Sequence, residues 1–314
     1  MWKDMDDLFS DPHLRNQLLK RLEEGWTYDK IEPMSMEEIF RRLNRLGIAV
    51  TPEAYRATAQ RYESAEAMAE EWYAQYTLQP EGPYDEDFVW MAAVILWPRL
   101  IPGRISLEQI DHRMQEGYDL LEQHRAPQAC DAWWQVWEWL KEKVTPERNT
   151  LEALDQDFRG MQSVFNWCQH FEMELWNTGL DDPNYLQLRI RYCREFLETF
   201  PHEEWSLQGN FLRAEAETLW ELGEIQTAEA RFQALIEANP DWAWGYIGWS
   251  DAYWLMKDSP KEYDKAEAIL RRALARPGLE DREDVIDRLN RLRAERAQAR
   301  SSKGRKRRRR RRKR

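Results

Sequence analysis

Residues 209–242, GNFLRAEAETLWELGEIQTAEARFQALIEANPDW, decide the fold prediction. Apolar residues recur every three or four positions on both sides of Gly223, which is the spacing of one helix face. They are Leu212, Ala216 and Leu219 before the glycine and Ala228, Phe232 and Leu235 after it. Gly223 permits the left-handed backbone of a tight turn, and Pro240 ends the second helix. The stretch therefore predicts two antiparallel helices, a helical hairpin.

The same arrangement recurs in residues 243–278. Apolar positions at helical spacing again flank a turn, which here contains a few additional residues around 258–262. They are Tyr246, Trp249 and Tyr253 before the turn and Ala266, Leu270 and Ala273 after it. Pro277-Gly278 ends this second hairpin. An amphipathic helix over residues 281–299 is expected to cover its exposed apolar face, as stacked hairpins require.

Both hairpins resemble the tetratricopeptide repeat (TPR) family, whose repeat is about 34 residues long. The resemblance depends on a small residue early in each second helix, a large residue four positions later and a closing proline: Ala228 and Ala266, Phe232 and Leu270, Pro240 and Pro277. It implies a right-handed α-solenoid of antiparallel hairpins. Residues 107–143 and 151–199 are similar but more degenerate. Position eight is Ala216 or Ser250 instead of glycine, which implies slightly more open packing.

The predicted organisation has three parts. Residues 1–100 form an N-terminal helical region, residues 101–299 form the TPR-like hairpins with their capping helix, and residues 300–314 form a disordered basic tail. This plan is similar to bacterial helical-repeat proteins that end in a SEC-C zinc motif. The Cys-x-Cys pattern of that motif is absent, so the resemblance brings no zinc ion.

Helix start and stop signals extend the all-α prediction to the rest of the chain. Ser35 with Glu38 and Ser106 with Gln109 have the spacing of capping boxes. Glycine is scarce, at 13 residues, and no run alternates as a strand would. Further helices are expected from Asp11-Pro12 onward, over 85–97 with Pro98 as its end, and over 151–176 as one long helix.

The composition excludes several classes of protein. Cys130, Cys168 and Cys193 are isolated, which argues against a disulfide framework and against a structural zinc site. The acidic N-terminus lacks the apolar region of a signal peptide. The longest apolar run, residues 88–97, is about half the length that a bilayer requires. We therefore predict a cytoplasmic protein with no transmembrane segment.

Catalytic motifs are missing from the sequence. It has no glycine-rich phosphate loop, no H-E-x-x-H and no G-x-S-x-G. Cys168 and His170 lie two residues apart on a predicted helix and therefore on different faces, which makes them a poor catalytic or metal-binding pair. The sequence predicts a protein that is not an enzyme and that needs no cofactor.

The TPR resemblance also implies a binding groove. In that family, positions 2, 5, 9, 12 and 13 of each first helix line the concave face. Here these positions are Asn210, Arg213, Glu217, Trp220 and Glu221 in the first hairpin and Trp244, Ile247, Asp251, Trp254 and Leu255 in the second. Carboxylates beside indole rings suit a partner peptide that contains Lys or Arg. The alternative is a solvated acidic surface over ordinary core aromatics, since most of the 17 tryptophans are expected in the core.

The charge is distributed unevenly along the chain. Residues 303–314 contain eleven basic residues and no acidic one, and the whole chain has a net charge of −11, so residues 1–302 carry −22. Such a run cannot bury itself and is expected to bind a polyanion such as RNA or DNA. Docking on the chain's own acidic body, on an acidic protein or on an anionic membrane, nuclear localisation and a solubility role remain alternatives. The candidate residues are Arg305, Lys306, Arg307, Arg308, Arg309, Arg310, Arg311, Arg312, Lys313 and Arg314.

Two functional hypotheses follow. The first is a protein-binding scaffold or adaptor that uses the groove for a protein or peptide partner and the basic tail for a polyanion. The second is an RNA- or DNA-associated factor in which the tail dominates binding and the hairpins serve as a platform.

Overall fold

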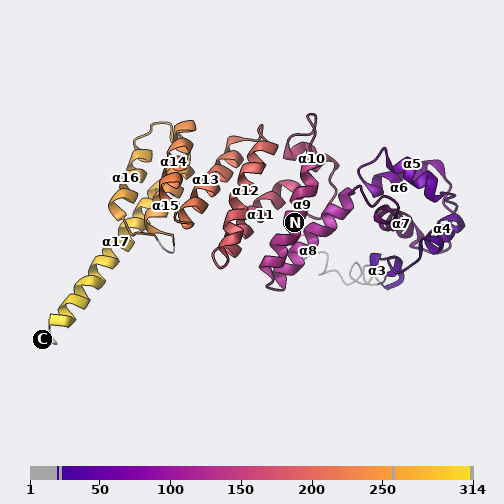
Figure 1. Cartoon of the computed structure of the whole chain (residues 1–314), viewed down its shortest axis with the longest axis horizontal. Coiled ribbons are helices and arrows are strands. Elements are labelled where there is room, and N and C mark those ends of the chain that lie inside the picture. Colours follow the sequence, from indigo (N-terminus) through magenta and orange to yellow (C-terminus); the bar gives the residue numbers. More distant parts are fainter. Residues whose placement is uncertain (1–19, 21–22, 257–258, 312–314) are drawn as a thin grey trace. The chain divides into compact units, whose positions relative to one another are not determined.

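The computed structural model describes residue 20, residues 23–256 and residues 259–311, with side chains described as far as residue 299. Within these residues the chain forms fifteen helices and no β-strand, so the all-α prediction is confirmed (Figure 1). None of the described helices is both long and apolar enough to cross a membrane. The helix predicted to begin at Asp11-Pro12 lies outside the described residues.

The chain divides into two compact units. Unit 1 contains the described parts of Met1–Asp119, Ala132–Glu142 and Phe158–Ser163. Unit 2 contains those of Leu120–Asp131, Lys143–Asp157 and Val164–Arg314. The boundary that the sequence predicts, between residues 100 and 101, falls inside unit 1.

The first named helices of unit 1 are α3 (Tyr28–Ile31), α4 (Met36–Arg45), α5 (Pro52–Ala59), α6 (Ala65–Gln75) and α7 (Asp85–Leu100). Three of them, α4, α5 and α6, have side-chain caps formed by residues a few positions away. Ser35 and Glu38 form the predicted capping box of α4. The Thr51 and Ser64 side chains accept hydrogen bonds from the first turns of α5 and α6.

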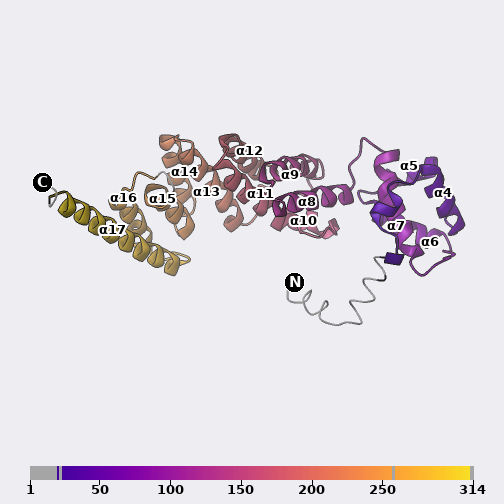
Figure 2. The same ribbon diagram turned by 90° about the horizontal axis from the view of Figure 1, so that it is seen from below.

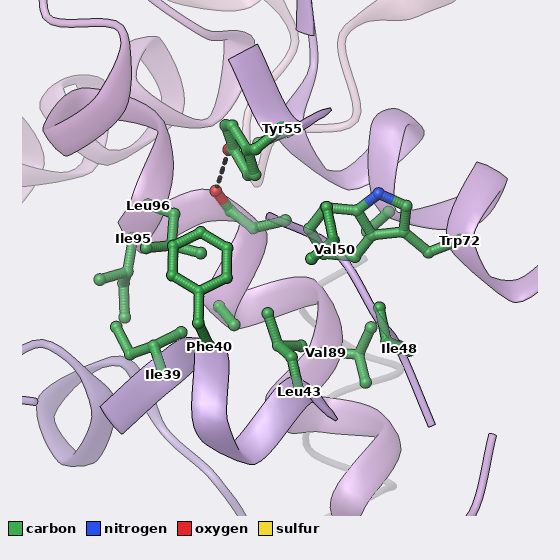
Figure 3. Close-up of a cluster of buried hydrophobic side chains, with 14 of the residues drawn as sticks. Ile39, Phe40, Leu43, Ile48, Val50, Tyr55, Trp72, Val89, Ile95 and Leu96 are labelled. Carbon is green, nitrogen blue, oxygen red and sulfur yellow. Dashed lines mark hydrogen bonds between the residues drawn. The ribbon is translucent and has the colours of Figure 1, made fainter. Parts of the chain in front are cut away.

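Helix α7 is the centre of the unit 1 core, and α3, α4, α5 and α6 all contact it. Figure 3 shows side chains of α4, α5, α6 and α7 gathered in one cluster, among them Phe40, Tyr55 and Trp72. The Tyr55 hydroxyl is fully buried and donates a hydrogen bond to the Ala93 carbonyl at 2.6 Å, so its burial leaves no polar group unsatisfied.

Helix α7 does not end before Pro98, so this prediction is wrong. The helix continues to Leu100 and contains Pro98 in its last turn. A proline lacks the backbone N–H that would donate to the carbonyl four residues earlier in the helix. Near a helix end this loss is small, because few helical hydrogen bonds remain to be formed after it. The Ile101 amide still donates to the Trp97 carbonyl at 2.8 Å and closes the last turn.

The next two helices are α8 (Leu107–Glu122) and α9 (Ala126–Lys141), and α8 begins at the capping box that the sequence predicts. Ser106 and Gln109 exchange the two hydrogen bonds of a capping box, at 3.1 and 3.3 Å. A β-carbon at Gly117 would lie 2.0 Å from Nε1 of Trp133, so only glycine admits this indole. The same nitrogen donates to the Met114 carbonyl at 2.9 Å.

The predicted single helix over residues 151–176 is also wrong. The structure has two helices there, α10 (Leu151–Asp157) and α11 (Val164–Gly179). The Asp155 carboxylate accepts hydrogen bonds from the amides of Val164, at 2.6 Å, and Phe165, at 3.2 Å. Because this carboxylate accepts hydrogen bonds from the first amides of α11, it stabilises a second helix start there. The chain therefore breaks between α10 and α11 although the apolar spacing predicts one helix.

Successive helices of unit 2 pack on one another in chain order (Figures 1 and 2). They are α11, α12 (Pro183–Thr199), α13 (Trp205–Glu221), α14 (Ile225–Ala238), α15 (Ala243–Trp254) and α16 (Tyr263–Leu274). Gly223 has φ +82°, as its turn requires. The two hairpins predicted from residues 209–278 are therefore present as α13–α14 and α15–α16.

Helix α17 (Arg282–Arg311) packs against α15 and α16 and is longer than expected. Its backbone stays helical over residues 300–311, where the sequence predicts a disordered segment. The physical reason is that Arg and Lys favour helix and that the run contains no proline. In both views the last turns of α17 extend beyond α15 and α16. Arg312, Lys313 and Arg314 lie outside the described residues.

Candidate functional site

Three of the predicted groove residues are buried in the core of unit 2. Trp220 is 6% exposed, Ile247 1% and Trp254 0%. Helix α15 contacts α13, α14, α16 and α17, so that most of its circumference is covered. The positions of these residues in the TPR-like repeat did not predict their burial. Helix α15 is short and has apolar side chains on nearly every face, so the pattern does not distinguish a buried face from an exposed one. Trp254 is consequently a packing residue, and its truncation would test stability instead of binding.

The half-buried groove residues on α13 and α15 interact with each other. Arg213 pairs with Glu217 at 3.6 Å, and its guanidinium lies 5.8 Å from the centroid of the Trp244 ring. The Asn210 side chain accepts a hydrogen bond from Arg213 at 3.4 Å. Gly248 makes room for this pair, because a β-carbon there would lie 2.8 Å from Cδ of Arg213.

Helix α17 and the residue before it supply partners for Asp251 and Trp244 of the predicted groove. Arg288 pairs with Asp251 at 3.2 Å, and the Trp244 indole donates to Asp281, just before α17, at 3.0 Å. Leu255, another predicted groove residue, is half-buried. The Glu217 and Asp251 carboxylates that the sequence offered to a basic peptide are therefore paired within the chain.

Asp251 is the most perturbed carboxyl group on this face. Burial raises its pKa to about 7, although the neighbouring Arg288 and Arg213 favour the charged form. Within the described part of the chain its Oδ1 has no hydrogen-bond partner. One ion pair at the edge of the core does not compensate for the lost hydration of this group.

Arg189 on α12 is a buried cation that sequence reasoning missed. It is 4% exposed, and it donates to Glu172 at 2.6 Å and to the Thr218 hydroxyl at 2.7 Å. The Trp176 ring lies 4.6 Å from its guanidinium carbon. Because these partners lie on α11 and α13, this arginine of α12 links three helices and has a structural role.

Two predicted groove residues, Trp220 and Glu221, lie at a different feature, a cavity of about 490 Å³. It lies where α13 ends, α14 begins, α15 ends and α16 begins. We call it the acidic pocket, and define it by Trp220, Glu221, Ile225, Glu229, Tyr253 and Glu262, with Lys265 at its edge. The described lining residues thus include three carboxylates and one ammonium group.

Aromatic rings form the apolar part of the acidic pocket. Trp220 and Tyr253 pack edge to face, with ring centroids 4.8 Å apart. The Tyr253 hydroxyl donates to the Glu229 carboxylate, and burial followed by this bond raises the pKa of the phenol. Ile225 is 37% exposed and adds an aliphatic surface.

Lys265 shows how a cation fits here. Its Nζ lies 5.1 Å from the centroid of the Tyr253 ring and 2.7 Å from the Glu262 carboxylate. The hydrogen bond to Glu262 is the largest of the causes that raise the pKa of this lysine. An ammonium between an aromatic face and a carboxylate is the arrangement that binds lysine and arginine side chains.

The neighbouring cavity, of about 510 Å³, differs in charge. Its described lining has three basic residues, Lys261, Lys265 and Arg296, and two acidic ones, Glu262 and Asp264. Arg296 already pairs with Asp264. The acidic pocket is therefore the cavity with an excess of carboxylates.

Sequence reasoning missed Glu229, Tyr253, Glu262 and Lys265 as site residues. They come from three helices and lie close to helix ends, where turns bring together side chains that share no periodic pattern. Glu229, Tyr253 and Glu262 resemble the predicted groove residues only in being acidic or aromatic, and Lys265 is basic.

The three cysteine thiols are buried, which raises their pKa values. Cys130, Cys168 and Cys193 are buried and free, and burial raises the pKa of each thiol, for Cys130 and Cys168 to about 12. A thiol with so high a pKa is a poor nucleophile and metal ligand at neutral pH. Nowhere in the described ranges do His, Cys, Asp and Glu side chains gather as a metal site would require.

Comparison with known proteins adds no family to this description. No protein-family model matches the chain, and no curated protein matches its sequence. The functional proposal therefore depends on the geometry of unit 2.

Proposed function

We propose that this chain is a non-catalytic scaffold of TPR-like hairpins that binds a lysine- or arginine-rich segment of a partner protein. The observation that carries the proposal is the acidic pocket, with three carboxylates around the Trp220–Tyr253 pair. It replaces the predicted groove as the proposed binding site, because the groove carboxylates Glu217 and Asp251 are each paired with an arginine, whereas the described lining of the acidic pocket has three carboxylates and one ammonium group.

A long basic side chain matches each part of the acidic pocket. Its methylene groups would lie against Ile225, and its charged head would lie near Glu229 and Glu262. The Tyr253 ring offers a cation–π contact at the position that Lys265 now occupies. A segment with several basic residues would also be attracted by the body of the chain, where residues 1–302 carry −22.

Peptide binding tests the proposal. A fluorescent peptide rich in Lys and Arg should bind the full chain, whereas an acidic peptide of the same length should not. We expect the double variant Glu229→Gln, Glu262→Gln to weaken binding about tenfold or more, that is, by about 1.4 kcal/mol. Glutamine keeps the shape and an acceptor for Tyr253, so that the fold is preserved.

The matched control is Glu237→Gln. Glu237 is exposed and lies near the other end of α14 from Glu229. Its substitution changes net charge by the same amount per site but leaves the acidic pocket intact. If the control weakened binding as much per site as the pocket variants do, attraction would be nonspecific and the proposal would fail.

Lys265→Gln provides a test with the opposite sign. It removes the chain's own cation from the acidic pocket and leaves Glu262 without this partner. We expect the basic peptide to bind about threefold more tightly, consistent with the modest energy of an exposed ion pair. Weaker binding would show that Lys265 does not occupy the peptide's position.

A second candidate function is binding of RNA or DNA by the basic run, Arg305–Arg314. The observation in its favour is that the backbone of α17 continues without a break as far as Arg311. Binding of a generic RNA and a generic duplex to the full chain and to residues 1–302, over a salt series, tests it. Affinity that falls steeply with salt and disappears on truncation supports this function; no binding by either form excludes it.

A further inference from the structure

We propose that the acidic pocket binds the basic run of a second copy of this chain, so that two copies join through their α17 ends. This inference rests on the proposed function, since it names the basic segment that the acidic pocket holds. The basic run is Arg305–Arg314, in which all ten residues are Arg or Lys.

Charge complementarity is the first argument. The described lining of the acidic pocket has three carboxylates and one ammonium group, and the body of residues 1–302 carries −22. The basic run carries +10 and contains no acidic residue that would oppose binding. A chain with both features has a complementary partner in every other copy of itself.

The direction of α17 is the second argument. Its contacts with α16 include the ion pairs of Arg293 and Arg296, which lie 2.9 and 3.3 Å from Glu267. Arg305 is nine residues further along a continuous helix, which is about 14 Å at 1.5 Å per residue. Figures 1 and 2 show that the last turns of α17 extend beyond α15 and α16. A copy's own basic run is therefore carried away from its own acidic pocket.

The position of the acidic pocket is the third argument. Glu262 and Lys265 stand at the start of α16, and Lys261, beside them, pairs with Glu295 of α17 at 3.4 Å. Helix α17 thus leaves the hairpins at the end where the acidic pocket lies. Two copies that face each other with these ends can exchange their basic runs reciprocally, which gives a closed two-fold dimer.

Sedimentation velocity of the full, nuclease-treated chain at low and high salt tests this inference. We expect a dimer at low salt that dissociates as salt is raised, because screening weakens the contacts. The pocket variant Glu229→Gln, Glu262→Gln should raise the dimer dissociation constant at least tenfold. The quadruple run variant Arg308→Gln, Arg309→Gln, Arg310→Gln, Arg311→Gln should do the same, whereas Glu237→Gln should have no effect.

Mixing the two variants gives the sharpest result. The pocket variant still has a basic run, and the run variant still has an acidic pocket, so one of the two contacts can form. We expect the mixture to form a heterodimer under conditions where each variant alone is monomeric. No heterodimer would overturn the proposal, and so would a wild-type chain that stays monomeric or forms open chains.

The peptide experiment separates this inference from the proposed function. If a free basic peptide binds the acidic pocket but the full chain stays monomeric, only self-association fails. If the peptide does not bind either, the proposed function fails with it. A dimer that depends on the basic run but persists in the pocket variant would show that the run binds elsewhere, which also overturns the proposal.

Discussion

Unit 1 and unit 2 each contain an aspartate that pairs with an arginine from another helix, and the two differ in what else surrounds the carboxylate. In unit 1, Asp85 at the start of α7 is 3% exposed and pairs with Arg42 of α4 at 2.7 Å. In unit 2, Asp251 of α15 has a 16% exposed side chain and pairs with Arg288 of α17 at 3.2 Å.

Hydrogen bonds make the difference between them. Burial acts to raise the pKa of Asp85, but donors from Arg42, two backbone amides and the Trp26 indole together lower it below the ordinary value. The amides of Glu81 and Gly82 both lie 2.7 Å from its Oδ2. Asp251 has no such set of donors, and burial raises its pKa to about 7. The number of donors, and not the presence of an arginine, decides the direction of the shift.

The largest effect is expected for Asp85→Ala. The substitution leaves Arg42, two backbone amides and the Trp26 indole without their acceptor in a nearly dry site. We expect a loss of about 3–5 kcal/mol in the stability of unit 1, the usual result of breaking a buried pair. Hydrogen exchange of the α4 and α7 amides measures this loss without requiring the two units to unfold together.

Asp85→Asn separates charge from shape in the same site. Because the folded pKa of Asp85 is lowered, its stabilisation is present above the unfolded value of 3.8 and is lost as pH falls through the folded pKa. The wild-type chain should therefore lose stability in unit 1 below about pH 4, and Asp85→Asn should lack this dependence. Equal acid sensitivity in both proteins would contradict the assignment.

A smaller effect of opposite sign is expected at Asp251. Its folded pKa is raised, so its stabilisation is complete below the unfolded value of 3.8 and is lost as pH rises through about 7. Between about pH 5 and pH 8 the wild-type chain should lose on the order of 2 kcal/mol in the stability of the α15–α17 region. Asp251→Asn should remove that loss.

Hydrogen exchange of the α15 and α17 backbone amides at about pH 5 and pH 8 measures this loss of stability. The control variant is Asp264→Asn. Asp264 also pairs with an α17 arginine, but its side chain is 86% exposed. Its removal should leave the pH dependence unchanged. A wild-type chain with equal stability at the two pH values would contradict the raised pKa of Asp251.

The features predicted correctly from the sequence are those that neighbouring residues determine. The Ser35–Glu38 and Ser106–Gln109 boxes and the Gly223 turn each depend on a few adjacent positions. The break between α10 and α11 was missed because it depends on Asp155 capping a helix nine residues away. The burial of Trp254 and the composition of the acidic pocket depend on how several successive helices pack together, which no local pattern specifies.

The smallest effect is expected for Trp26→Phe, which removes one of the donors to Asp85. The indole nitrogen lies 3.2 Å from Oδ1, and the ring also stacks 4.2 Å from the Arg42 guanidinium carbon. Phenylalanine keeps most of that stacking surface, so the loss should be about 1 kcal/mol, the net value of a typical hydrogen bond. NMR titration of the Asp85 carboxyl should show a higher pKa than in the wild type, but one still below that of Asp251. If losing a single donor moved Asp85 as high as Asp251, the donors would act as one cooperative set, and counting them would no longer explain the difference between the two units.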